Sequence, residues 1–201
     1  MVTVYVEGGG NSNKDTTIRC REGFARYCKN VVSHTSSPRI VACGGRDQAF
    51  HRWKTELARS KSGDVCVLLV DSEGPVQNTL SPTSHLQASD GWRFSVSEIQ
   101  RVFLMVQAME SWFLADRDAL ETYYGSGFRR RSLPGDEGHV EQIRKDDLEP
   151  SLVNATRDTK KGPYHKTRHG FALLALIQPS KVEAGSSHAE AFHSFLRSLP
   201  T

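Results

Sequence analysis

The chain has 201 residues, a formal net charge of +3, and 37% hydrophobic and 24% charged residues, which is typical of a soluble globular protein with one substantial core. The longest apolar run, from Val65 to Val70, is too short to cross a bilayer, and the chain opens into a strand-like segment rather than a signal peptide. These features exclude a membrane protein and predict a cytoplasmic location, where the four cysteines, which form no CxxC pair, would be reduced thiols.

The first third of the chain alternates between strand and helix patterns. Three short β-branched or apolar runs predict strands, and two segments with apolar residues at spacings of three and four predict helices. In chain order these elements are a strand at Val2 to Val6, a helix from about Arg19 to Val32, a strand at Arg39 to Cys43, a helix from Asp47 to Ser60 and a strand at Val65 to Val70. This order predicts an α/β fold of the Rossmann-like kind, with a mostly parallel sheet and helices on both faces.

The remaining residues are more polar. We expect a long polar connection from Val76 to Val96, a fourth strand within Val102 to Gln107, a helix through Leu114, and further helices at Asp118 to Tyr124, Val140 to Val153, Phe171 to Ile177 and Ala189 to Leu199. The organisation predicted is an α/β core over residues 1–125, followed over 126–201 by a basic loop and a C-terminal helical extension. Both parts would pack as one compact domain.

Acidic residues follow two of the predicted strands. Glu7 follows the first strand, and Asp71 and Glu73 follow the third. Ligands of open parallel sheets gather at the carboxyl ends of the strands, and carboxylate oxygens are the ligands that Mg²⁺ prefers. Either position alone is more simply a turn residue, but their joint occurrence predicts a site for Mg²⁺ or Mn²⁺.

The motifs around these acids resemble the TOPRIM domain of topoisomerases, primases and OLD-family nucleases, in which a strand-terminal Glu is joined by an Asp-x-Asp after a later strand. Here the second motif is Asp-x-Glu, from Asp71 to Glu73. Over nearly its whole length the chain is more similar still to a family of small bacterial TOPRIM-like proteins that are often encoded beside ATPases in phage-defence loci. The further motifs that carry this resemblance are Cys43-Gly44-Gly45-Arg46, Met109 to Asp116 and Lys161 to Lys166.

The resemblance implies a metal-dependent nuclease, an antiphage effector that cleaves phosphodiester bonds of DNA or RNA. Glu7 would be a general acid/base or a metal ligand, and Asp71 and Glu73 would hold the metal. Glu110 is a candidate fourth ligand, although an exposed acid near a helix start is an equally good interpretation. Asp116 is expected to cap the next helix rather than to bind metal.

Cationic residues provide candidate contacts to phosphate. Lys166 would neutralise charge on the phosphate during catalysis, and Arg46, at a strand end, could bind a phosphate through two hydrogen bonds. Contacts to a nucleic-acid backbone are predicted for the remaining basic residues, Arg129, Arg130, Arg131, Lys160 and Lys161. For each lysine alone, a solvated surface position is the simpler interpretation.

Two other functions stay open from the sequence. One is a non-catalytic interaction subunit that regulates an ATPase partner, which the Asp-x-Glu departure and the modest basicity allow. The other is a phosphoesterase acting on a small nucleotide, for which a closed, narrow pocket would be expected.

Overall fold

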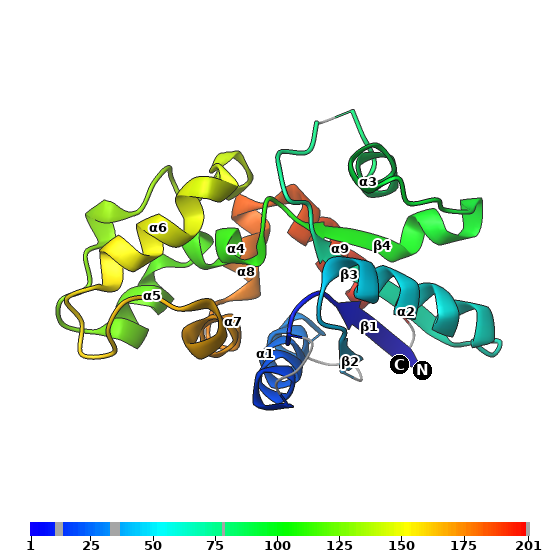
Figure 1. Ribbon diagram of the computed structural model, residues 1–201, viewed down its shortest axis with the longest axis horizontal. Helices are drawn as coiled ribbons and strands as arrows, with labels where there is room; N and C mark the ends of the chain where they lie inside the picture. The colour runs from blue at the N-terminus through cyan, green and yellow to red at the C-terminus, as the bar shows by residue number, and fades with distance from the viewer. Residues whose placement is uncertain (11–13, 33–36, 78, 200–201) are drawn as a thin grey trace.

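A computed structural model describes residues 1–10, 14–32, 37–77 and 79–199 of the chain. A parallel sheet with strand order β2-β1-β3-β4 forms its centre (Figure 1). Its strands are β1 (Val2–Val6), β2 (Arg39–Ala42), β3 (Val65–Asp71) and β4 (Val102–Met105). The predicted α/β class and parallel sheet are therefore confirmed.

Helices cover both faces of the sheet, as predicted. Side chains alternate along each strand, so Val4 and Val67 belong to one buried cluster while Tyr5 and Leu68 belong to the other. The first cluster includes residues of α1 (Lys14–Val32) and α9 (Ser187–Ser198), and the second includes residues of α2 (Arg46–Arg59) and α3 (Pro82–Asp90). Because both faces are covered, β1 and β3 are almost entirely apolar.

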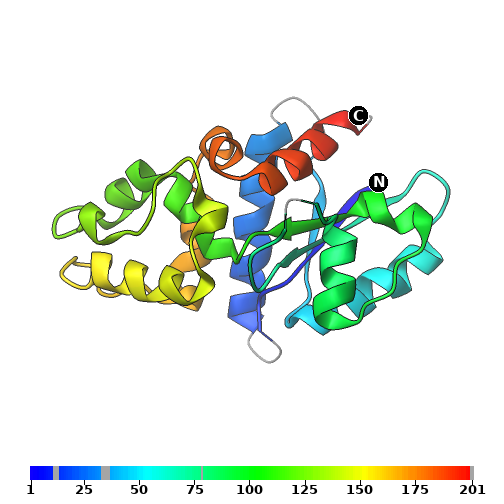
Figure 2. The same ribbon diagram turned by 90° about the horizontal axis from the view of Figure 1, so that it is seen from above.

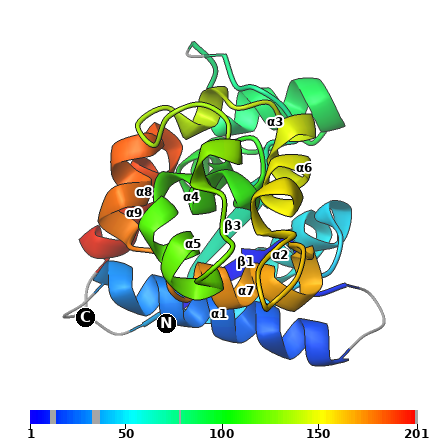
Figure 3. The same ribbon diagram turned by 90° about the vertical axis from the view of Figure 1, so that its left-hand side faces the viewer.

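The other helices gather beside the carboxyl ends of the strands. They are α4 (Met109–Ala115), α5 (Arg117–Tyr124), α6 (Lys145–Thr156), α7 (Phe171–Leu174) and α8 (Pro179–Gly185). Figure 2 shows α5 and α6 on one side of α1 and the sheet on the other, and Figure 3 views the molecule from the side of these helices. The polypeptide that follows β1 and β3 therefore faces a layer of helices.

The expected long polar connection from Val76 to Val96 is partly helical. It contains α3, and a 3₁₀ helix, η1 (Val96–Arg101), follows it. The Ser81 hydroxyl accepts a hydrogen bond from the Ser84 N–H at 3.2 Å, and Pro82 takes the first helical position. Gly91, with a φ of 70°, ends the helix, and Leu86 anchors it in the core. Ser81, Pro82 and Gly91 are helix-capping signals that the sequence contains, but the polar composition of the segment favoured the prediction of a loop.

Other elements also differ from the sequence-based expectations, and the helix expected between Val140 and Val153 is a 3₁₀ turn, η3 (Val140–Gln142), followed by α6. Helix α1 begins at Lys14, before the first strongly apolar position, and α8 was not predicted. The helix expected from Phe171 to Ile177 is limited to α7, which a π-helical turn, η4 (Lys166–Gly170), precedes. No helix within the described ranges combines the length and the apolar character that a membrane span needs.

Candidate metal centre

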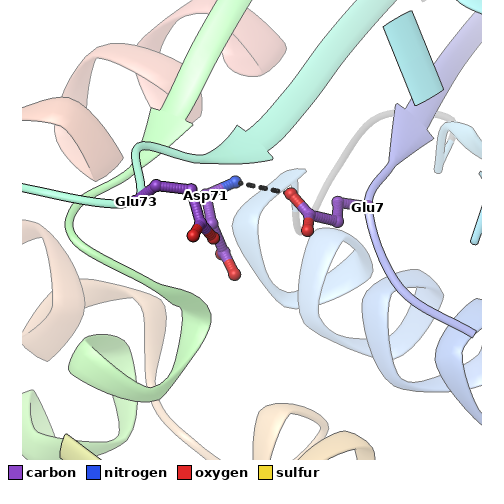
Figure 4. A group of neighbouring side chains, drawn as sticks. All are labelled: Glu7, Asp71 and Glu73. Carbon is purple, nitrogen blue, oxygen red and sulfur yellow. Dashed lines mark hydrogen bonds between the residues drawn. The ribbon is translucent and has the colours of Figure 1, made fainter. Parts of the chain in front are cut away.

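The three predicted acids lie together at the carboxyl edge of the sheet: Glu7 follows β1, Asp71 is the last residue of β3, and Glu73 lies two residues beyond it. The two strands are neighbours with Val6 opposite Leu69, and the Glu7 N–H donates to the Leu69 carbonyl oxygen at 3.2 Å. One carboxylate oxygen of each of Glu7, Asp71 and Glu73 lies within 4.8 Å of the other two (Figure 4). The strand order therefore places the predicted acids within reach of one ion.

Asp71 is the buried centre of this group and is 4% exposed. Its backbone N–H donates to Glu7 Oε2 at 3.3 Å, and its Oδ1 accepts a hydrogen bond from the Met109 N–H, at the start of α4, at 2.8 Å. Burial raises the pKa of Asp71 well above its ordinary value, against the opposing charge of Lys166. The side chain is thus fixed in one orientation, and its charged form depends on a nearby cation.

Lys166 supplies such a charge from the turn η4. Its Nζ lies 3.4 Å from Glu110 Oε2 and 3.8 Å from Asp71 Oδ2. Burial opposes the charged ammonium, but the carboxylates of Asp71, Glu110 and Glu7 outweigh that effect and raise the pKa of Lys166. Lys166 is therefore a fixed cation at the edge of the acidic group.

Glu110 lies beside Lys166 and is 3% exposed, which is incompatible with an exposed helix-start position. Its Oε1 accepts a hydrogen bond from the Tyr164 hydroxyl at 3.0 Å. Glu110 is not one of the three clustered acids. Its carboxylate and that of Asp71 both contact the Lys166 ammonium, which lies between them. The structure thus places Glu110 where it holds Lys166.

Glu73 is the most exposed of the three acids, and its conformation is unusual. It has a φ of 65°, which is uncommon for a residue with a side chain. Its N–H donates to the Gln107 carbonyl oxygen at 3.0 Å, and its carboxylate forms an ion pair with Lys145 of α6. The hydrogen bond to Gln107 therefore fixes the backbone of Glu73, and its carboxylate is paired with Lys145.

Glu7 adds a second partly desolvated carboxylate. Burial raises its pKa above the ordinary value, while the charge of Arg46 acts in the opposite direction. Two desolvated carboxylates and a third nearby repel one another unless protons or a cation neutralise them. Three carboxylates in this arrangement form a donor set of the kind that hard divalent cations prefer.

Comparison with known protein families gives one match. The model of the family described as Domain of unknown function (DUF4276) matches residues 6–197. The chain belongs to this family. No curated protein and no solved structure matches. The match spans all the acids described above, so the candidate centre lies within the DUF4276 domain.

Arg46 of this DUF4276 domain is engaged by protein groups rather than free for a phosphate. Its Nε and Nη2 donate to the two carboxylate oxygens of Asp90 at 2.8 and 2.7 Å, and its Nη1 donates to the Asp71 carbonyl oxygen. The guanidinium also lies 5.2 Å from the centre of the Trp92 ring. Arg46 therefore connects α2 to the end of β3.

The basic triplet of this DUF4276 domain lies outside the acidic group, between α5 and α6. Arg129 pairs with Asp158, and Arg130 pairs with Asp118, Glu121 and Glu137. Arg131 and Lys160 are exposed, and Lys161 lies 4.8 Å from the centre of the Tyr123 ring. The charges of Arg129 and Arg130 are thus largely neutralised within the protein.

Two residues of the DUF4276 site were missed by sequence reasoning. Lys145 had no local signal, because its contact with Glu73 joins residues that are 72 positions apart. Tyr164 lies inside the Lys161 to Lys166 motif, but its hydrogen bond to Glu110 depends on the packing of distant segments. Asp116 accepts a hydrogen bond from the Ala119 N–H at 3.2 Å, as the capping prediction expected.

Proposed function

We propose that this protein is a metal-dependent nuclease that cleaves phosphodiester bonds of nucleic acid. The observation that carries the proposal is the convergence of Glu7, Asp71 and Glu73 on one point, with the ammonium of Lys166 beside Asp71. Metal-assisted phosphoryl transfer needs acidic ligands for a cation and fixed positive charge near the reacting phosphate. Both are present at the carboxyl edge of the sheet.

Glu7, Asp71 and Glu73 would hold the cation, and the donor set fits Mg²⁺ or Mn²⁺. All the donor atoms that these residues offer are carboxylate oxygens, and one oxygen of each residue lies within 4.8 Å of the other two. When bound, the ion supplies polarisation of the phosphodiester and neutralises charge on the leaving oxygen. Asp71 is oriented for this role by the Met109 N–H, which fixes one of its two oxygens.

Lys166 would act on the substrate directly. The Lys166 ammonium remains charged at neutral pH, so it stabilises the negative charge that builds on the phosphate oxygens. Glu7 would act either as a metal ligand or, where it does not bind the ion, as a general acid/base. Glu110 positions Lys166 through their contact at 3.4 Å.

Several finer aspects of the proposal rest on the resemblance to TOPRIM-like proteins. They are a relationship to TOPRIM nucleases, a cytoplasmic role in antiphage defence, and an ATPase partner encoded nearby. The Asp71-Ser72-Glu73 motif and the strand-terminal Glu7 support the relationship, since both acids follow neighbouring parallel strands.

Cleavage assays with matched variants test the proposal. Purified protein is incubated with plasmid DNA, single-stranded DNA and single-stranded RNA, with Mg²⁺, Mn²⁺ or EDTA. Cleavage that needs the metal and is lost in Glu7→Gln and Asp71→Asn supports the proposal. Glu56→Gln, near the C-terminal end of α2 and so toward the amino ends of the strands, is the control and should cleave like the parent.

Equal cleavage by the parent and both site variants would overturn the proposal. A parent protein that neither binds Mn²⁺ nor cleaves any substrate, but associates tightly with the product of a neighbouring ATPase gene, would instead support a non-catalytic regulatory subunit.

A further inference from the structure

A second concave site adjoins the turn that carries Lys166. It is a cavity of about 280 Å³ between α1, η4 and α7. Its lining includes three arginines, Arg19 and Arg26 of α1 and Arg168 of η4, and a single acid, Glu22. The cavity therefore has an excess of positive charge.

These arginines differ from the basic residues predicted from the sequence. Arg46, Arg129 and Arg130 form ion pairs with carboxylates of the protein. Within the described part of the chain, Arg19, Arg26 and Arg168 form no ion pair, and all three are exposed. Their guanidinium groups are thus available to an external anion.

The spacing of the arginines suits an extended anion. Arg19, Gly23 and Arg26 lie on one stripe of α1, and seven residues separate the two arginines by about 10 Å along the helix axis. Arg168 lines the same cavity from a different element, the turn η4. A cavity of about 280 Å³ is at the lower limit of sites that enclose a small ligand, so contact with part of a longer chain fits it better.

The cavity is connected physically to the acidic group. A β-carbon at Gly8, next to Glu7, would lie 3.1 Å from Cys20 Sγ of α1 and 3.5 Å from the Phe171 ring of α7. A β-carbon at Gly23 would lie 2.6 Å from the Phe171 carbonyl oxygen, so α1 and α7 are in close contact (Figure 3), and both residues line the cavity. Arg168 is two residues from Lys166. The same close-packed elements therefore position the acids and the arginines.

We infer that Arg19, Arg26 and Arg168 form a binding site for a backbone phosphate of the nucleic-acid strand, next to the phosphodiester held at the acidic group. The inference rests on the proposed nuclease function and adds the surface on which the strand is held. Guanidinium groups bind phosphate oxygens through paired hydrogen bonds without reading the base sequence. The larger cavity of about 770 Å³ beside Glu73 is less suited to phosphate, because carboxylates outnumber cationic side chains in its lining.

Oligonucleotide binding in EDTA tests the site separately from catalysis. Fluorescence anisotropy would compare the parent with Arg19→Gln, Arg26→Gln and Arg168→Gln over a series of salt concentrations. Each variant should bind roughly three- to tenfold more weakly, and the slope of log affinity against log salt should decrease by about one. Arg168→Lys should keep the parent's slope with weaker binding, since it retains the charge but not the paired hydrogen bonds.

The control is Arg59→Gln, because Arg59 is exposed in the last turn of α2, toward the amino ends of the strands. The inference would be overturned if all three glutamine variants had the same affinity and salt slope as Arg59→Gln. In that case metal-dependent cleavage would still support the nuclease proposal. A mononucleotide or inorganic phosphate that binds as tightly as the oligonucleotide would also overturn it, because the site would then serve a small anion. A parent protein that binds no oligonucleotide in EDTA would overturn the inference, while the cleavage assay with added metal tests the nuclease proposal separately.

Discussion

The ammonium of Lys166 lies 3.4 Å from the Glu110 carboxylate, in a contact between residues 56 positions apart in the chain. Glu110 is buried, and its second oxygen accepts a hydrogen bond from the Tyr164 hydroxyl at 3.0 Å. The same ammonium lies 3.8 Å from Asp71. Lys166 therefore neutralises part of the charge on the buried side of the acidic group, beside the three carboxylates of Glu7, Asp71 and Glu73 that are proposed to share a metal ion.

The first prediction concerns the charge of Lys166 in the metal-free protein. Lys166→Ala leaves Asp71 and Glu110 buried without their cation, which should lower the free energy of unfolding in EDTA by about 1–2 kcal/mol, a value reduced for the partial exposure of Lys166. Mg²⁺ should then stabilise this variant more than it stabilises the parent. Thermal unfolding with EDTA and with Mg²⁺ measures both effects. Lys160→Ala, in an exposed position of the same loop, is the control, and an equal response of the two variants would contradict the role of Lys166.

Glu110 should act through Lys166 rather than as a metal ligand. We expect Glu110→Gln to reduce the cleavage rate at saturating Mg²⁺ by about tenfold or more, with metal affinity within about threefold of the parent. Asp71→Asn should lose metal binding itself. Calorimetric titration with Mn²⁺ separates the two variants, and a loss of Mn²⁺ binding in Glu110→Gln as large as in Asp71→Asn would show that Glu110 is a ligand.

Lys145 should compete with the metal for Glu73. The ion pair between them is exposed, so removing it should change the free energy of unfolding by less than about 1 kcal/mol. Lys145→Ala frees the Glu73 carboxylate, and we expect Mg²⁺ affinity to rise about three- to tenfold. Arg144→Ala is the matched control, because within the described residues Arg144 forms its ion pair with the exposed Asp146, at 3.6 Å. An unchanged metal affinity in Lys145→Ala would mean that Glu73 does not bind the ion.

Stability should also depend on pH through His193 in α9. Burial lowers the pKa of His193 to about 4 from its ordinary value of 6.5, although the Glu183 carboxylate opposes the shift. The unfolded chain therefore binds a proton below about pH 6.5 that the folded protein does not bind, so stability present above that pH is lost as pH falls toward 4. The loss should reach at most about 3 kcal/mol.

Chemical unfolding of the parent and His193→Gln between pH 7 and 4 checks this dependence. The Gln variant can still donate to Glu183, whose Oε1 lies 2.8 Å from His193 Nδ1, so its stability should fall less steeply over this range. Parallel pH curves for the two proteins would assign the pH dependence to other groups.

The features that the sequence predicted correctly are those with a short-range signal. The apolar strands β1 and β3 are recognisable from their residues, and their order makes them neighbours, so the proximity of Glu7 and Asp71 follows from local patterns. The cap at Ser81 and the glycine at Gly91 also mark α3, but a polar segment with one apolar anchor resembles a loop. Helix propensity and capping therefore need to be weighed even where hydrophobic periodicity is weak.

The features that could not be predicted depend on tertiary contacts. The pairs Arg46–Asp90 and Lys145–Glu73 join residues 44 and 72 positions apart, and no local pattern distinguishes these arginines and lysines from free ones. Phosphate binding by Arg46 stays a prediction, based on its position after two glycines at a strand end, and no local pattern indicated that its guanidinium would contact Asp90. Identifying an available cation requires knowing which carboxylates the fold brings near it.

The central claim is that Glu7, Asp71 and Glu73 share one divalent ion, and anomalous diffraction from a crystal soaked in Mn²⁺ tests it most directly. The account predicts a single strong anomalous peak bonded to oxygens of all three carboxylates, with Lys145 displaced from Glu73. Crystals that show no peak at full Mn²⁺ soaking, with the Lys145–Glu73 pair intact, would contradict it.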